Sequence, residues 1–321
     1  MKIVLLDSKT LGQDIDLSAF YRFGEFIVYQ TTKDDEKFER VEGADIVITN
    51  KVIFDRAFLA KLPKLKLIAL TATGMNNVDL KAASEFGVSV KNVAGYSTKS
   101  VAQHTITLVL ALVSRLEFYD SYVKKGKWCG SRIFTNLDKR FYEIDGKNWG
   151  IIGLGAIGKE VAKIASVFGA KVSYFSTSGI KRDELYPSLP LDELLKNSDI
   201  ITIHAPLNEQ TKNLISKREL TLLKQDAVIV NTGRGGIVNE ADLAEAIENE
   251  KIYAASDVLE IEPMRIDSPL ANLTKQERFI ITPHVAWGSV EARKRLMEAV
   301  CKNIEEFIKK VRRYDNGGKR T

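Results

Sequence analysis

The chain has 321 residues, of which 45% are hydrophobic and 28% charged, a mixture that excludes a protein disordered throughout and leaves room for about two domains. Its net charge of +5 comes from 47 basic and 42 acidic residues dispersed along the chain, apart from the basic segments 309–313 and 319–320 of the tail, so a nucleic-acid-binding stripe is excluded. Mean hydropathy is −0.12, and the longest strongly apolar stretch, 105–113, is far short of the ~20 residues that a membrane span needs.

Short β-branched runs alternate with amphipathic helical stretches from one end of the chain to the other. The strands predicted in the first third are 2–6, 26–29, 45–49, 67–70 and 88–91. Those predicted from residue 149 onward are 149–152, 171–175, 200–204, 228–231, 254–258 and 279–282. The later runs are almost continuously apolar, as is typical of parallel strands buried on both faces. We therefore predict an α/β fold with two doubly wound parallel-sheet domains.

Two long helical patterns mark the domain organisation. Residues 100–122 contain neither glycine nor proline and predict one unbroken helix between the two sets of strands. Residues 291–311 predict a final helix with no strand left to follow it, so we expect this helix to pack back on the first domain. The predicted domains are therefore a discontinuous one, 1–99 with 289–321, and an inserted one, 100–288.

A glycine-rich loop, Gly153-Leu-Gly155-Ala-Ile-Gly158, joins the strand 149–152 to a helical pattern. In this setting Gly153 permits the tight turn, Gly155 lets the backbone approach a pyrophosphate, and Gly158 lets helix and strand pack closely. A pyrophosphate then lies at the helix N-terminus, where free N–H groups favour an anion. The loop predicts a dinucleotide site; the alternative is a glycine-rich turn without a ligand.

The end of the next strand bears on the choice between NAD and NADP. An acidic residue there usually binds the ribose 2′-hydroxyl of NAD. This chain has Ser176-Thr-Ser-Gly179 instead, followed by Lys181 and Arg182. Hydroxyls and cations suit a 2′-phosphate, so we expect NADP or dual use. The alternative is a plain polar turn, with Asp183 and Glu184 facing solvent.

Three segments at the ends of later strands each carry one ionisable group: Arg234 in 231–236, Glu262 in 257–263 and His284 in 282–288. An arginine can hold a carboxylate by a bidentate fork. A histidine can give a proton to a forming alkoxide, and a carboxylate beside it favours the imidazolium and orients the ring. Together they suit reduction of a 2-oxo acid by a nicotinamide. Taken singly, Arg234 can cap a turn, Glu262 can be a surface carboxylate and His284 a core histidine.

Five motifs in this order resemble the D-isomer-specific 2-hydroxyacid dehydrogenases over almost the full chain. They are the glycine loop, His204-Ala-Pro-Leu207 with Thr211, and the segments 231–236, 257–263 and 283–284. The resemblance implies a Rossmann cofactor domain at 100–288, inserted in a flavodoxin-like substrate domain. It also implies that Arg234 binds the substrate carboxylate and carbonyl, that Glu262 (not Glu260) supports His284, and that His284 is the general acid or base.

The resemblance further implies the ligand contacts. Asp257 is expected at the nicotinamide amide. The other expected cofactor contacts are Gly153, Gly155, Ala156, Ile157, Gly158, Ser176, Thr177, His204, Pro206, Thr232 and Gly233. The expected substrate contacts besides Arg234 are Thr73, Gly74, Met75 and Trp287.

Within the family, the segment 92–105 with Gln103, and Trp287 after the histidine, are similar to glycerate dehydrogenases and hydroxypyruvate reductases. Hydroxypyruvate or glyoxylate is therefore the expected substrate. Met75 departs from the threonine common in that subgroup, and Ser176 from the usual aspartate. His104 is interpreted as a structural histidine.

Alternatives within the same fold are a nucleotide-sensing corepressor-like protein, which can retain these residues, and a phosphite or phosphoglycerate dehydrogenase. A formate dehydrogenase is disfavoured because it has glutamine where Glu262 stands. The family implies a homodimer with 100–122 at the interface. The two cysteines, Cys129 and Cys301, exclude a disulfide scaffold or a cysteine-rich zinc site and favour a reducing, cytoplasmic location. We expect neither a metal nor a nucleic-acid or membrane partner.

Overall fold

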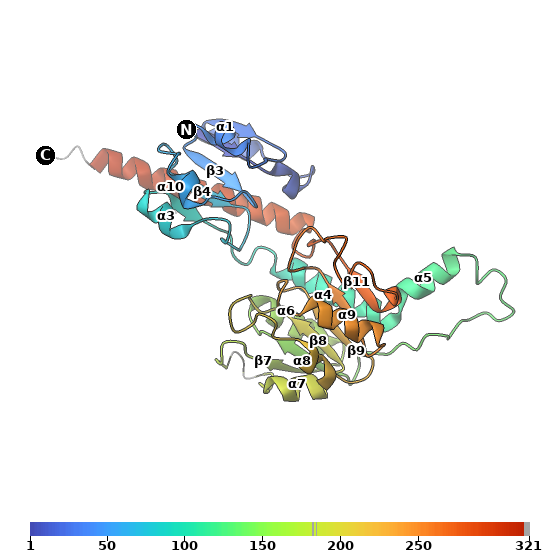
Figure 1. Cartoon of the computed structure of the whole chain (residues 1–321). Helices are drawn as coiled ribbons and strands as arrows, with labels where there is room; N and C mark the ends of the chain where they lie inside the picture. The colour runs from blue at the N-terminus through green and yellow to red at the C-terminus, as the bar shows by residue number, and fades with distance from the viewer. Residues whose placement is uncertain (182, 184, 318–321) are drawn as a thin grey trace. The chain divides into compact units, whose positions relative to one another are not determined.

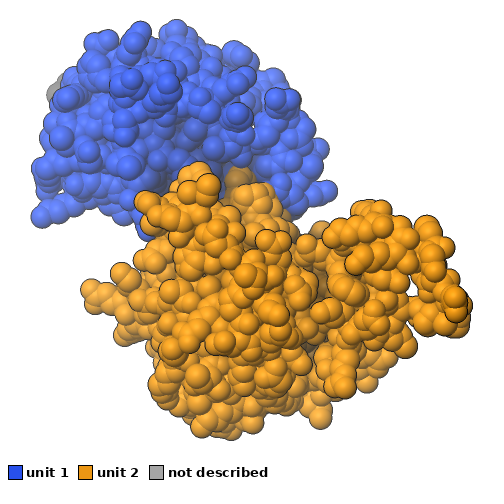
Figure 2. Space-filling view, turned by 45° about the vertical axis from the view of Figure 1, so that its right-hand side comes forward, with its two compact units in different colours: residues 1–97, 288–321 blue, residues 98–287 orange. Residues whose placement is uncertain are grey.

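The computed structural model describes residues 1–181, 183 and 185–317. Two compact units make up the chain, Met1–Ser97 with Gly288–Thr321, and Thr98–Trp287, and Figure 2 colours them separately. Every strand predicted from the sequence forms, with its ends displaced by two residues at most. The sheets of both units are parallel, which confirms the predicted α/β class. The predictions made for Arg182, Glu184 and the basic positions 319–320 lie outside the described residues.

The first unit has a five-stranded sheet in the order β2-β1-β3-β4-β5, which is the flavodoxin-like order. Its strands are β1 (Lys2–Leu5), β2 (Glu25–Val28), β3 (Ile46–Thr49), β4 (Leu67–Leu70) and β5 (Ser89–Lys91). Its helices are α1 (Lys37–Val41), α2 (Arg56–Leu59), α3 (Leu80–Glu85) and α10 (Val290–Gly317), with short 3-10 turns at Ser8–Leu11 and Ser18–Phe23. The inner strands β3 and β4 are buried at every position because helices cover both faces.

Helix α10 belongs to this unit although it follows the second unit in the chain. Leu296, Val300 and Ile304 are fully buried at a spacing of four residues, which forms one apolar stripe, and α10 contacts β4. Polar contacts add to this packing, since Arg293 lies 3.0 Å from Asp14 and Arg22 lies 3.2 Å from Glu305. The first unit is therefore built from both ends of the sequence (Figure 1).

The second unit has a six-stranded sheet in the order β11-β10-β9-β8-β6-β7. Its strands are β6 (Asn148–Ile152), β7 (Lys171–Phe175), β8 (Ile200–Ile203), β9 (Ala227–Asn231), β10 (Ile252–Ser256) and β11 (Phe279–Ile281). Its helices are α4 (Thr98–Ser114), α5 (Leu116–Lys124), α6 (Ala156–Val167), α7 (Leu191–Asn197), α8 (Lys217–Leu222) and α9 (Glu240–Glu248), with a 3-10 turn at Gln276–Arg278.

Two apolar clusters cover the two faces of this second sheet. One joins the sheet to α7, α8 and α9, and the other joins it to α4 and α6. Strands β7 and β8 lie on opposite sides of β6, so the chain direction switches beside the carboxyl end of β6. In open α/β sheets ligands bind at such a switch point. The topology therefore places the glycine loop, which follows β6, at the expected binding edge.

The prediction of one unbroken helix over 100–122 is wrong. The helix ends at Ser114, Arg115 takes a left-handed φ of 56°, and α5 leaves at a bend of 63°. The Arg115 side chain is the cause: its guanidinium donates to the carbonyls of Leu112 and Arg140 and stacks 3.3 Å from the Tyr253 ring centroid. These tertiary contacts outweigh the local helical pattern. Among the described residues no single helix is long and apolar enough to span a membrane; only α4 and α5 taken together pass that test.

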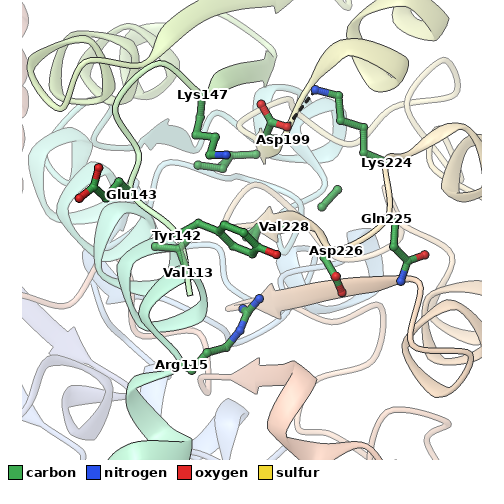
Figure 3. A pocket seen from close by; sticks show the side chains of 12 residues that line it. Val113, Arg115, Tyr142, Glu143, Lys147, Asp199, Lys224, Gln225, Asp226 and Val228 are labelled. Carbon is green, nitrogen blue, oxygen red and sulfur yellow. Dashed lines mark hydrogen bonds and ion pairs between the residues drawn. The ribbon is translucent and has the colours of Figure 1, made fainter. Parts of the chain in front are cut away.

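A cavity of about 220 Å³ opens at the opposite, amino edge of the second sheet (Figure 3). It is lined by the starts of β8 and β9, by Arg115 and Tyr142, and by Lys147. Asp199 and Lys224 form an ion pair of 2.9 Å in its wall. Because this cavity lies at the amino ends of the strands, it is separate from the edge that carries the predicted site.

Candidate active site

The glycine loop has the geometry that a dinucleotide needs. Gly153 has a φ of +91°, and a Cβ there would lie 2.9 Å from the Ala205 nitrogen. A Cβ on Gly158 would collide with the Gly153 carbonyl, so helix α6 packs directly on the turn. Gly155, by contrast, faces open space within 4 Å, and no described side chain caps the helix that begins at Ala156. The N-terminus of α6, with Ile157 in its first turn, therefore offers uncapped N–H groups beside an open backbone, which fits a pyrophosphate.

The segment after β7 is held by its own hydroxyl groups. The Ser176 hydroxyl donates to the Ile180 carbonyl at 2.6 Å, and Thr177 is half-buried beside it. Asp183 pairs with Lys159 of α6 at 3.0 Å. No acidic side chain stands at the end of β7 itself, where Phe175 and Ser176 lie. The described part of this segment thus has the polar, hydroxyl-rich character that the sequence predicts.

His204 lies at the end of β8, directly before Ala205 and Pro206. Its backbone N–H donates to the Ile152 carbonyl at 2.8 Å. Burial lowers the pKa of the His204 imidazole to about 3, so the ring is neutral in ordinary buffers. Its Nδ1 lies 3.4 Å from the Thr232 hydroxyl, and its buried Nε2 has no hydrogen-bond partner among the described residues. The hydroxyl of Thr211 closes the following turn by donating to the Pro206 carbonyl at 2.6 Å.

The turn after β9 presents Arg234 to solvent. Asn231 closes this turn, since its Oδ1 accepts from the Gly233 N–H at 3.0 Å and its amide donates to the Arg234 carbonyl at 2.9 Å. The Arg234 side chain is exposed and donates to the Gly233 carbonyl at 2.8 Å. Gly235 lies so close to the backbone of Leu259 that a Cβ would overlap its carbonyl. The arginine turn is therefore docked on the segment that carries Glu262.

Glu262 and His284 form the central contact of the site. Glu262 Oε2 lies 2.7 Å from His284 Nδ1, and Glu262 Oε1 accepts from the Leu259 N–H at 3.1 Å. The carboxylate is an acceptor, so Nδ1 carries the proton toward it and Nε2 is the nitrogen left for proton exchange. The side chains are 30% and 32% exposed, which leaves them open to a ligand. Glu260, whose N–H donates to Glu240 at 2.7 Å, takes no part in this contact.

Asp257 holds the backbone around His284. Its carboxylate accepts from the N–H groups of Val285 and Ala286, each at 2.9 Å, and its carbonyl accepts from the His284 N–H at 2.8 Å. These bonds compensate the left-handed φ of 53° at His284. The Asp257 side chain is only 1% exposed, and its hydrogen bonds hold the loop that carries His284. Its contact with a nicotinamide stays a prediction.

The predicted substrate contacts fall in different units. Thr73, Gly74 and Met75 belong to the first unit, where the Thr73 hydroxyl donates to Val93 at 3.0 Å and Met75 packs on the apolar core. Trp287 ends the second unit and is half-buried. Thr282 and His104 were not identified from the sequence as parts of the site, yet they contact Asp257 and each other. The available signal was a histidine among the largely buried residues of α4.

Comparisons with known proteins agree with this geometry. Residues 106–286 match the family model described as D-isomer specific 2-hydroxyacid dehydrogenase, NAD binding domain. The chain is 38% identical to a hydroxypyruvate reductase of Blautia hydrogenotrophica, covering 96% of this chain and 97% of that protein. It is also 38% identical to a glycerate dehydrogenase of Methylorubrum extorquens, covering 96% of this chain and 96% of that one.

A solved structure has a similar fold over almost the whole chain. The D-lactate dehydrogenase of Aquifex aeolicus, complexed with NAD and lactic acid, superimposes with a TM-score of 0.82 at 28% identity and covers 96% of each chain. The family model matches more than half of the chain, and relatives above 30% identity match almost all of it. This chain belongs to the D-isomer-specific 2-hydroxyacid dehydrogenases, a family of nicotinamide-dependent oxidoreductases.

Proposed function

We propose that the protein reduces a small 2-oxo acid, with hydroxypyruvate and glyoxylate as favoured substrates, to the D-2-hydroxy acid. The observation that carries this proposal is the 2.7 Å contact between His284 Nδ1 and Glu262 Oε2, beside the exposed Arg234 turn. The unit 98–287 is the proposed cofactor-binding domain, and the unit formed by both chain ends is the proposed substrate-binding domain.

The residues divide the chemistry between them. Arg234 binds the substrate carboxylate through its guanidinium and polarises the neighbouring carbonyl. The nicotinamide, when bound, supplies a hydride to C2 of the acid. His284 Nε2 gives its proton to the developing alkoxide while the Glu262 carboxylate holds the ring and favours the imidazolium. In the oxidative direction the same nitrogen takes the proton back.

The other substrate and cofactor contacts are still predictions, and we propose them here. Thr73, Gly74, Met75 and Trp287 are proposed around the substrate. The glycine loop, the end of β7, His204, Pro206, Thr232, Gly233 and Asp257 are proposed around the cofactor. In support, Gly155 is open and the α6 N-terminus has no side-chain cap.

The testing experiment is a set of initial rates with hydroxypyruvate, glyoxylate, pyruvate and 2-oxoglutarate, each with NADH and NADPH. We expect fast turnover of hydroxypyruvate or glyoxylate that is lost in His284→Ala. Nucleotide binding without turnover of any acid would contradict the enzyme and support a corepressor-like sensor.

For the cofactor we propose NADP or dual use. Support comes from Ser176, which stands where an NAD-selecting acid is usual, with Lys181 in the same segment. In the experiment above, the initial rate with NADPH should match or exceed the rate with NADH. Ser176→Asp should shift the ratio of kcat/KM values toward NADH. A strong preference for NADH in the unaltered protein would overturn this part alone.

We also propose that two copies associate. The resemblance implies residues 100–122 at the interface, and the exposed end of that range, α5, begins an arm formed by residues 116–142. Figure 1 shows α5 and the segment after it projecting from their unit. The arm exposes apolar side chains, above all Phe134 at 88% and Leu137 at 71%, with Leu116, Trp128 and Ile133. Exposed apolar side chains concentrated in one segment are typical of an association site. Phe134→Lys should yield a monomer in sedimentation, whereas Val167→Lys, at an equally exposed valine of α6, should not.

Finally, we propose a reducing, cytoplasmic location. Both cysteines are free thiols, Cys129 exposed and Cys301 buried. An exposed free thiol persists best where disulfides are kept reduced. Labelling of Cys129 by a membrane-permeant reagent but not by an impermeant one in intact cells would agree with this location.

A further inference from the structure

Most of the buried residues of helix α4 are apolar. Three of its polar side chains, Ser100, His104 and Thr105, form hydrogen bonds at the carboxyl edge of the second sheet. Ser100 donates to the Ala286 carbonyl at 2.6 Å, and the hydroxyls of Thr105 and Thr232 lie 2.8 Å apart. Between them, His104 Nε2 lies 3.0 Å from the Thr282 hydroxyl. Each contact reaches a segment that carries a residue of the active site.

The direction of the His104 contact follows from its neighbours. The Thr282 hydroxyl has one proton and directs it to Asp257 Oδ1 at 2.5 Å. That carboxylate also accepts from the two backbone N–H groups of the His284 loop, so it acts throughout as an acceptor. The Thr282 oxygen must therefore accept from His104, and His104 carries a proton on Nε2.

A continuous chain of hydrogen bonds thus leads from α4 to the catalytic histidine. It runs from His104 to Thr282, from Thr282 to Asp257, and from the Asp257 residue to three successive backbone N–H groups at 284–286. Those backbone groups set the position of His284, whose ring then meets Glu262. Chained hydrogen bonds of this kind polarise one another, so loss of the first weakens the next.

We propose that His104 is a positioning residue for the reaction: its Nε2–H orients the Thr282 hydroxyl onto Asp257 and so holds the 282–287 loop where His284 can exchange its proton. This inference rests on the proposed role of His284. A residue that only fills space would need no donor nitrogen. At 3.7 Å from Asp257 Oδ1, the ring also adds direct attraction to the carboxylate whenever it is protonated.

The test compares His104→Ala with His104→Gln, which keeps an N–H donor at a similar reach. In His104→Ala we expect kcat to fall about ten-fold, because a small misplacement of a catalytic group is costly. KM for the nucleotide should change less than about two-fold, since the glycine loop is untouched. The midpoint of the pH–rate profile should move to lower pH, because a displaced His284 ring loses part of its contact with the Glu262 carboxylate, which favours the imidazolium. His104→Gln should recover most of kcat, and Gln103→Ala, at an exposed neighbour on α4, should behave as the unaltered protein.

Equal impairment in His104→Gln and His104→Ala would show that ring volume matters rather than the donor, and would overturn the proposal. So would a lower Tm in His104→Ala with unchanged kcat and midpoint. If His104→Ala does not fold, Thr282→Val breaks the same chain one step later, and it should give the same fall in kcat and the same shift.

A second readout separates this inference from the proposed function. The chain has 3 histidines, so long-range ¹H–¹⁵N spectra of the full-length protein show three ring systems that single substitutions assign. We expect His104 to be protonated at Nε2, and a bare Nε2 would overturn the proposal whatever the enzyme turns over. Normal turnover in His284→Ala would instead refute the proposed function and leave the tautomer result standing.

Discussion

His284 Nδ1 and Glu262 Oε2 lie 2.7 Å apart, although 22 positions separate the two residues in the chain. Both residues also form a hydrogen bond to the backbone of the 257–259 segment. The His284 N–H donates to the Asp257 carbonyl, and the Glu262 carboxylate accepts from the Leu259 N–H. One short stretch after β10 therefore fixes both members of the pair.

Replacing His284 by alanine removes the proposed proton donor. We expect kcat to fall by ~10²-fold or more, as is usual for a lost general acid, while nucleotide affinity stays within a few-fold. Steady-state rates and fluorescence titration with NADPH measure the two effects. Glu260→Gln is the matched control, because Glu260 lies in the same segment as Glu262 but takes no part in the contact with His284. Near-normal turnover in His284→Ala would rule out the assignment.

Glu262→Gln keeps the size of the side chain and removes its charge. The neutral amide no longer favours the imidazolium, so we expect the midpoint of the reductive pH–rate profile to shift to lower pH. Below that midpoint the variant should retain part of its activity, since the proton donor is still present. Glu260→Gln, two residues away and outside the pair, should leave the profile in place. An unmoved midpoint in Glu262→Gln would count against the pairing.

Gly235→Ala should displace the arginine turn. The added Cβ overlaps the Leu259 carbonyl, and backbone cannot yield as a flexible side chain does. We expect KM for the 2-oxo acid to rise about ten-fold or more through misplaced Arg234. Gly155→Ala offers a contrast, since its Cβ meets open space in the protein alone and should instead weaken nucleotide binding. The two KM values, measured for both variants, separate the effects.

The buried His204 makes stability depend on pH. Its folded pKa of about 3 lies below the usual value of 6.5, so between these values the unfolded chain binds one more proton than the folded one. Its contribution is fully present above pH 6.5 and is lost as the pH falls toward 3. Between pH 6.5 and 5 the loss amounts to roughly 2 kcal/mol.

Urea unfolding at both pH values measures this dependence. His204→Asn lacks the titrating ring, so its free energy of unfolding should fall by about 2 kcal/mol less than that of the unaltered protein over the same interval. The comparison cancels the titration of carboxylates, which both proteins share. Identical slopes would mean that His204 is accessible to protons in the folded state.

Short segments of the sequence determine much of the architecture. The strand at residues 67–70 appears at the predicted position because a continuous apolar run bounded by polar residues suits a buried parallel strand. The glycine loop and the strand-end segments with Arg234, Glu262 and His284 follow for the same reason, since each motif needs only its neighbours along the chain. The identity of the chemistry therefore came from short stretches of sequence.

Long-range contacts decided the rest. The helical pattern does not predict that the helix ends before Arg115, because the Tyr253 ring on which Arg115 stacks lies 138 positions further along the chain. Likewise the sequence predicts only a structural role for His104. Its contact with the Thr282 hydroxyl, at 3.0 Å, joins residues that are 178 positions apart in the chain. Motifs and strands are readable from the sequence because their causes are local. The bend after α4, the neutral His204 and the hydrogen-bond chain to His284 were decided by tertiary structure, because burial and pairing exist only once distant segments meet.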